Sequence, residues 1–175
     1  LPEAFTDFGS LKLFNKYISP LLIISVLTCF VLYYIFKYTD IGRKLIAAGA
    51  NPDAAELSGI SVDRMFIYCH MLSGFLAALA GIMLTARIGA AIPSMAGHLG
   101  FDWLLPAFLA PVLGGTLLSG GKVTVFGTML GAILVTLINN GLYLIDVGEF
   151  WVRFFLGIIL LLSLIHISEP TRRLS

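Results

Sequence analysis

The chain has 175 residues, of which 58% are hydrophobic and 12% are charged, with a formal net charge of +1 and a mean hydropathy of +0.96. Roughly a quarter of the residues of a soluble domain are charged, so this composition indicates an integral membrane protein, and the small net charge argues against a nucleic-acid partner. Cys29 and Cys69 each lie inside an apolar run, which argues against a disulfide framework.

Transmembrane helices are predicted from the length of the apolar runs. A spanning helix needs about 20 mainly apolar residues, because each residue rises ~1.5 Å and the hydrocarbon core is ~30 Å thick. We therefore predict an all-α membrane protein with about five transmembrane helices, at residues 18–38, 65–86, 101–118, 123–145 and 150–162. The third run contains Pro106 and Pro111 and ends in Gly114-Gly115. It is expected to be kinked or broken, and to face protein or a water-filled cavity rather than lipid.

Residues 39–64 form the only long polar, charge-bearing segment between two of these runs. Asn51 and Pro52 are suited to cap and open a helix, and Gly59 to end it. One short helix of about two turns is therefore predicted in this loop. Asp53 and Glu56 place negative charge near its start, where the helix dipole favours it.

One side of this short helix is narrow, because Ala54, Ala55 and Ser58 are small residues at neighbouring positions of its surface. A narrow side allows another protein to approach closely, which favours a docking helix. A solvated connector between two membrane helices remains the alternative explanation.

Small and polar residues inside the apolar runs each have two explanations. The small residues Gly127 and Gly131, and the stripe Ser73, Gly74, Ala77, Ala78 and Gly81, are explained by close helix packing, with the lining of a pathway as the alternative. Asn139 and Asn140 point ~100° apart on a helix. Because amides are costly in lipid, at least one is expected to face a neighbouring helix or an aqueous vestibule. Interhelical hydrogen bonding and contact with a transported molecule both remain open.

The isolated ionisable residues point to structural roles. His70 is predicted to be a hydrogen-bonded interior histidine, because Gly74 stands at the i+4 position where a second metal ligand would be needed. Arg87 and Arg153 lie near helix ends, where long basic side chains extend to the interface. The sequence shows no catalytic, metal-binding or phosphate-loop motif, so we predict no enzymatic activity, no metal site and no cofactor.

Three ordered segments carry a family resemblance. The loop from Thr39 to Arg64 reads T-x-x-G-R-x-x-x-A-x-G-x-N-x-x-A-A-x-x-S-G-I-x-V-x-R. Residues 113–122 read LGGTLLSGGK, and GTMLGA at 127–132 and NNGL at 139–142 follow. Together they resemble the ribose and simple-sugar permeases of bacterial ABC importers, within the wider branched-chain amino acid/ribose permease superfamily. The resemblance covers residues 1–161 and implies the C-terminal part of a ten-helix-type permease.

The resemblance implies that the loop helix is the coupling helix, which sits in a cleft of a cytoplasmic ATPase and transmits its closure to the membrane helices. The implied ATPase-coupling residues are Asn51, Asp53, Ala54, Ala55, Glu56, Ser58 and Gly59. The loop is then cytoplasmic, residues 114–122 lie at the inner surface, and residues 90–100 and 146–149 lie outside. There Asp146 and Glu149 either contact a basic partner surface or form an ordinary hydrated turn.

The function implied by the resemblance is that of a multi-pass permease subunit of the bacterial inner membrane that imports ribose or a related simple sugar. The implied partners are a cytoplasmic ABC ATPase that hydrolyses ATP, a second permease subunit identical or not, a periplasmic or lipid-anchored sugar-binding protein, and membrane lipid. Candidates for the translocation path or for helix packing are Gly114, Gly115, Thr116, Asn139 and Asn140. Thr116 and Ser119-Gly120-Gly121 favour the sugar branch over a branched-chain amino acid or nucleoside permease, and a non-transporting membrane scaffold is the remote alternative.

Both ends of the chain are expected to differ from a natural protein. Residues 162–172 read LSLIHISEPTR, which resembles the translation of a sequencing adapter. We therefore expect the natural sequence to stop near Leu161 and residues 162–175 to be an artefactual tail, whose apolar residues would prolong the fifth helix. A genuine polar tail, in which Arg172 and Arg173 follow the positive-inside rule, is the alternative. The chain also begins at Leu1 without methionine, so its N-terminus is expected to be incomplete.

Overall fold

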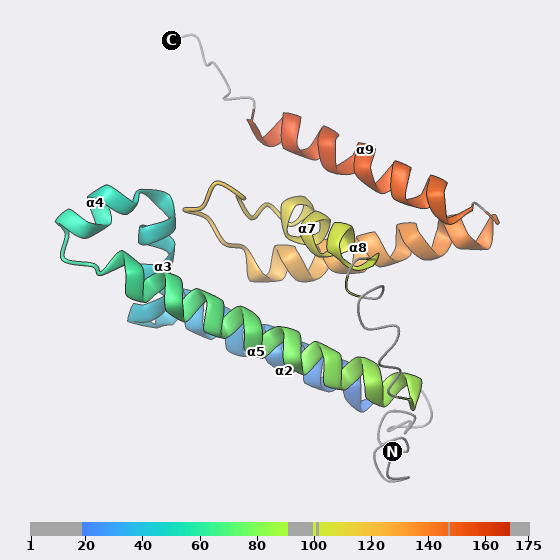
Figure 1. Cartoon of the computed structure of the whole chain (residues 1–175), viewed down its shortest axis with the longest axis horizontal. Coiled ribbons are helices and arrows are strands. Elements are labelled where there is room, and N and C mark those ends of the chain that lie inside the picture. Colours follow the sequence, from blue (N-terminus) through green and yellow to red (C-terminus); the bar gives the residue numbers. More distant parts are fainter. Residues whose placement is uncertain (1–18, 91–99, 101, 147, 169–175) are drawn as a thin grey trace. The chain divides into compact units, whose positions relative to one another are not determined.

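A computed structural model of the chain describes residues 19–90, 100, 102–146 and 148–168 (Figure 1). All the regular elements in these ranges are helices, which confirms the predicted all-α fold. The chain divides into two compact units, Leu1–Ala96 and Gly97–Ser175. Residues 1–18 and 91–99, and the part of the suspected tail at 169–175, lie outside the described residues.

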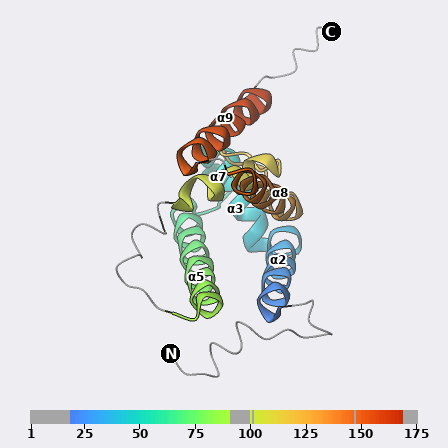
Figure 2. The same ribbon diagram turned by 90° about the vertical axis from the view of Figure 1, so that its right-hand side faces the viewer.

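The first unit contains two long apolar helices joined by two shorter ones. The helices are α2 (Pro20–Tyr38), α3 (Asp40–Ala50), α4 (Pro52–Leu57) and α5 (Val62–Ile88). Helix α2 closely follows the predicted run 18–38, and α5 begins before the predicted residue 65, with Asp63 in its first turn where the helix dipole favours an acidic side chain. Figure 2 shows α2 and α5 as two separate helices.

Helix α3 corrects the prediction of a single short helix in the loop. Thr39 caps its start, and Asp40 in its first turn pairs with Lys44 at 2.6 Å and with Arg43 at 3.8 Å. The signals were present in the sequence, since a threonine followed by an acidic residue is typical of a helix start. Gly42 and Gly49 obscured them, because glycine disfavours a helix by about 1 kcal/mol relative to alanine.

The second unit contains α7 (Leu104–Leu113), α8 (Val125–Leu144) and α9 (Glu149–Ser168). The predicted break of the third run falls elsewhere than expected, because α7 continues through Pro106 and Pro111 and stops at Gly114. Pro106 lies in the first turn, where its missing N–H has no partner to lose. Gly115 then turns the chain with φ +80°, so residues 114–118 are not helical.

The core of the second unit is formed by three helices. It is made of the buried apolar residues Leu109, Ala110, Val135, Val152 and Leu156. Helices α7 and α8 approach backbone to backbone, since a Cβ at Gly131 would overlap the carbonyl oxygen of Ala110, and one at Gly127 that of Gly114. The predicted close packing by these two glycines is therefore confirmed.

Three helices in the described part of the chain are long and apolar enough to cross a membrane: α2, α5 and α8, with hydropathies of 2.0, 1.8 and 1.6. Helix α7 is a shorter apolar helix. None of the apolar window of α5 is buried (0%), and a Cβ at Gly74 or Gly81 would meet nothing within 4 Å. The predicted packing partner of the α5 stripe is therefore not among the described residues.

Candidate functional site: the coupling loop

The start of α4 is fixed by the residues that the sequence indicated. The Asn51 Oδ1 atom accepts a hydrogen bond from the Ala54 N–H at 3.1 Å, and Pro52 occupies the first helical position. The Asn51 N–H also donates to the Ala47 carbonyl at 3.2 Å, at the end of α3. One residue therefore ends α3 and caps α4, and the predicted cap is confirmed.

The end of α4 is a Schellman turn. Gly59 has φ +80°, a conformation that glycine adopts without strain. Its N–H donates to the Glu56 carbonyl at 2.9 Å, and the Ile60 N–H donates to the Ala55 carbonyl at 3.0 Å. The Ser58 hydroxyl donates to the Ala54 carbonyl at 2.8 Å. Gly59 thus ends the helix as predicted.

Ala55 points inward, which corrects the prediction that it lies on a narrow side open to another protein. It is 4% exposed and packs in a cluster with Ala48 of α3 and with Val62 and Met65 of α5. Leu45 and Ile60 cover this cluster. Burial of these apolar side chains stabilises the placement of α4, so Ala55 acts as a packing residue in this chain.

The outward face of α4 combines acidic and apolar side chains. Asp53, Ala54, Glu56 and Ser58 are exposed, and Leu57 is 91% exposed, the highest value among the exposed large hydrophobic residues described. Leu57 is two residues from the buried Ala55, about 200° around the helix, so it faces away from the cluster. Leu57 was not among the residues predicted for coupling. The sequence feature that could have indicated it is a large apolar side chain at the last position of a helix whose buried side is formed by an alanine.

Three of the predicted path residues pack within the second unit, namely Gly114, Gly115 and Thr116. Gly114 lies against the backbone of Gly127. The Thr116 hydroxyl lies 3.1 Å from that of Thr124 and 3.2 Å from that of Thr128, and it accepts the Thr124 N–H at 3.1 Å. The Thr124 hydroxyl donates to the Gly114 carbonyl at 2.5 Å. These contacts, with Gly115 in the turn, fasten the loop after α7 to the start of α8.

The two asparagines of α8 differ in exposure. Asn139 is half-buried, one turn beyond the buried Val135, and Asn140 is exposed. Within the described residues, neither side-chain amide has a hydrogen-bond partner. Asn140 therefore presents an unpaired amide on an apolar helix, beside Leu137, which is 63% exposed.

Two ionisable residues make contacts that bear on their predicted roles. Arg153 bonds Asp102 at 2.7 Å and Glu149 at 2.5 Å, and its extension to the membrane interface stays a prediction. His70 is hydrogen-bonded as expected, with Nδ1 2.8 Å from the Phe66 carbonyl, but it is exposed rather than interior. No His, Cys, Asp or Glu group suited to a metal occurs in the described part of the chain.

Comparison with known protein families matches residues 2–164 to the family described as branched-chain amino acid transport system / permease component. The chain belongs to this family. This assignment agrees with the superfamily predicted from the loop and the glycine-rich segments, and it identifies the three long apolar helices as parts of a multi-pass protein of the bacterial cytoplasmic membrane.

Curated relatives carry the names of transport permeases, two of them for sugars. The chain is 40% identical over 158 residues to a probable ABC transporter permease protein, YphD, of Escherichia coli, covering 90% of this chain and 46% of the relative. It is 38% identical over 146 residues to the ribose import permease protein RbsC of Haemophilus influenzae, covering 83% and 44%. The xylose transport system permease protein XylH of the same organism is 38% identical over 158 residues, covering 89% and 41%. The chain thus spans less than half the length of these relatives, and no solved structure matches it.

Proposed function

We propose that this chain is part of the permease subunit of an ATP-driven importer for a monosaccharide such as ribose or a related simple sugar. The exposed, acidic and apolar face of α4 carries the proposal, because a capped helix held outside the apolar spans is suited to dock on another protein. The names of the ribose and xylose relatives support the sugar branch. The activity belongs to the full-length protein.

Helix α4 is the proposed contact with a separate cytoplasmic ATPase. Leu57 would enter an apolar pocket, and the exposed carboxylates of Asp53 and Glu56 would meet basic side chains at its rim. Closure of the ATPase would then displace α4. The cluster around Ala55 would pass this displacement to α3 and α5.

The proposed sugar-facing residue is Asn140, with Asn139 beside it. A side-chain amide offers both donors and an acceptor, which match the hydroxyl groups of a sugar. The exposed, unpaired amide of Asn140 supports this role. A hydrogen bond to the second permease subunit is the competing role, and Asn140→Leu would separate the two. Loss of transport with intact assembly identifies a path residue, whereas loss of assembly identifies an interface residue.

The complete importer would include a second permease subunit and a sugar-binding protein on the outer side. Near the predicted outer end, Asp146 lies in a turn with φ 57°, and Glu149 is paired with Arg153. Asp146 is therefore the better candidate for contact with basic groups of the binding protein. Glu149 is already satisfied within its own helix.

Transport by the full-length protein tests this proposal. The complete gene would be expressed with its neighbouring ATPase and binding protein, and uptake of labelled ribose, xylose and leucine would be measured in membrane vesicles. We expect ATP-dependent uptake of a sugar. Uptake of leucine alone would instead support a branched-chain amino acid permease, and complete assembly with no uptake of any substrate would support a scaffold.

A further inference from the structure

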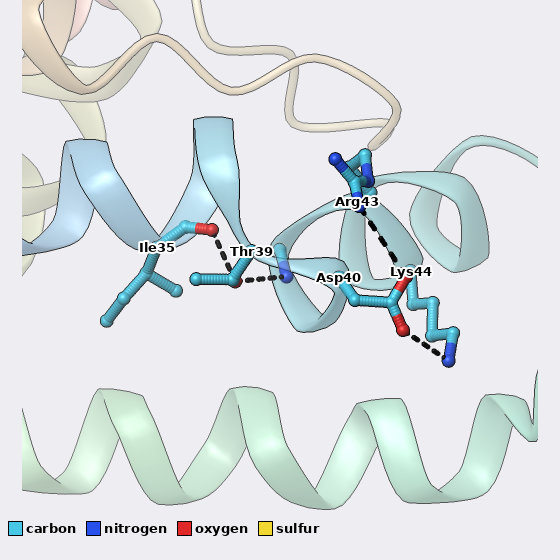
Figure 3. A network of polar contacts seen from close by, with 6 residues as sticks. Ile35, Thr39, Asp40, Arg43 and Lys44 are labelled. Atoms are coloured by element: carbon cyan, nitrogen blue, oxygen red, sulfur yellow. Dashed lines mark hydrogen bonds and ion pairs between the residues drawn. The ribbon is translucent and has the colours of Figure 1, made fainter.

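The junction between α2 and α3 is built around one side chain. Helix α2 ends at Tyr38 and α3 begins at Asp40, so Thr39 alone lies between them. Its hydroxyl donates to the Ile35 carbonyl of α2 at 2.6 Å and accepts the Gly42 N–H of α3 at 3.2 Å (Figure 3). We call Ile35, Thr39 and Gly42 the Thr39 corner. A large change in the angle between α2 and α3 would break one of these bonds.

Gly42 brings the backbones of α2 and α3 into direct contact at this corner. It is buried, and a Cβ built on it would overlap the Ile35 carbonyl oxygen and lie 2.6 Å from the Cα of Phe36. The backbones of α2 and α3 are therefore in direct contact, with no flexible side chain between them. Such contacts resist deformation because closely packed backbones have no space into which to move.

The other end of α3 is fixed to α4. Asn51 alone separates the two helices, and Ala48 of α3 packs against Ala55 of α4 in the buried cluster. Helix α3 packs on α2, α4 and α5, and α2 and α5 are separate helices (Figure 2). A displacement of α4 therefore has a continuous rigid route through α3 to α2.

We propose that α3 is a rigid connector that transmits the movement of α4 to α2, with Thr39 and Gly42 as its positioning residues. This inference rests on the proposed function, since α4 must be moved by a partner. The Thr39 corner adds a second route to the direct one from α4 into α5.

The test measures the number of sugar molecules transported per ATP hydrolysed by the full-length importer. Thr39→Val keeps the shape of the side chain and removes the hydroxyl, and Thr39→Ser keeps the hydroxyl. Thr28→Val is the matched control, because the Thr28 hydroxyl makes the same bond to the Ile24 carbonyl, at 2.8 Å, within α2 and away from the corner. Gly42→Ala opens the corner by a different change.

We expect Thr39→Val and Gly42→Ala to lower the transport-to-ATP ratio roughly fivefold, because a perturbation of about 1 kcal/mol corresponds to a factor of about five. ATPase binding should stay unchanged, and Thr39→Ser and Thr28→Val should match the wild type. A wild-type ratio in Thr39→Val, or an equal loss of ATPase binding and transport, overturns the connector. If Gly42→Ala fails to fold, Thr39→Val and Thr39→Ser still test whether α3 is a connector. A wild-type protein that neither binds an ATPase nor transports sugar overturns the proposed function itself.

Discussion

A substitution at Leu57 should weaken docking on the ATPase without affecting folding. It is 91% exposed, so Leu57→Ser should leave the fold intact. Burying a leucine contributes about 1.5–3 kcal/mol, so this change should weaken ATPase binding roughly 10- to 100-fold if the side chain enters a pocket. Affinity measured with purified ATPase checks this. Leu144→Ser, at an 85% exposed leucine of α8, should not alter the affinity, and an equal effect of both changes would contradict a specific contact.

Substitutions of two glycines in α8 should have different effects on stability. A Cβ at Gly131 would overlap the Ala110 carbonyl of α7, whereas one at Gly141 meets nothing within 4 Å. Gly131→Ala should therefore destabilise the second unit by about 1–3 kcal/mol, because overpacking forces the two helices apart. Gly141→Ala should be neutral or slightly stabilising, because alanine favours a helix. Thermal unfolding of the full-length protein in detergent checks both, and equal stabilities would contradict the close approach.

At the scale of the element, α3 carries a pH-dependent contribution to stability. The hydrogen-bonded Lys44 ammonium, with Arg43 nearby, holds the pKa of the Asp40 carboxyl below its usual value. A lowered folded-state pKa means that the ionised carboxylate stabilises the helix above its unfolded pKa, and that this stability is lost as the pH falls through the folded pKa. Asp40→Asn should therefore lower stability slightly at about pH 7, and this difference should shrink as the pH falls below the unfolded pKa of the carboxyl. Unfolding in detergent over a series of falling pH values measures the difference, and a difference that grows toward acid would contradict a contribution from this ion pair.

Element boundaries show what sequence patterns can and cannot predict here. The cap at Asn51 and the stop at Gly59 were predictable because each depends on the conformation of one residue. Helix α3 was not predicted, because Gly42 is unfavourable in a helix and is required only by its contact with the backbone of α2. The inward turn of Ala55 likewise depends on Ala48 and Met65, which lie on other helices. Local chemistry was thus readable from the sequence, and contacts between elements were not.

At the scale of the whole molecule, the exposed apolar faces are consistent with a part of a larger assembly. Of the apolar windows of α2, α5 and α8, 6%, 0% and 11% are buried, and the chain covers 46% of the relative YphD. Family membership was predictable because it depends on short motifs that can be recognised, in order, in the sequence. The sugar pocket was not, because a pocket is formed by residues of several helices and the relatives extend well beyond this chain.

Membrane topology provides the test that applies to the whole chain, because the proposed docking requires α4 to lie in the cytoplasm. Glu56→Cys on α4 and Gly148→Cys before α9 are both at exposed positions, and each would be introduced into full-length protein freed of native cysteines, including Cys29 and Cys69. A membrane-impermeant maleimide should label Gly148→Cys in intact spheroplasts and Glu56→Cys only in inverted vesicles. Between residues 56 and 148 the chain contains the candidate spans α5 and α8 and the shorter apolar helix α7. If α7 also crosses the membrane, the two residues lie on opposite sides. If α7 does not cross, they lie on the same side. Labelling of both cysteines from the same side would therefore contradict the predicted path of α7, and the reverse pattern would place α4 where no cytoplasmic ATPase can reach it.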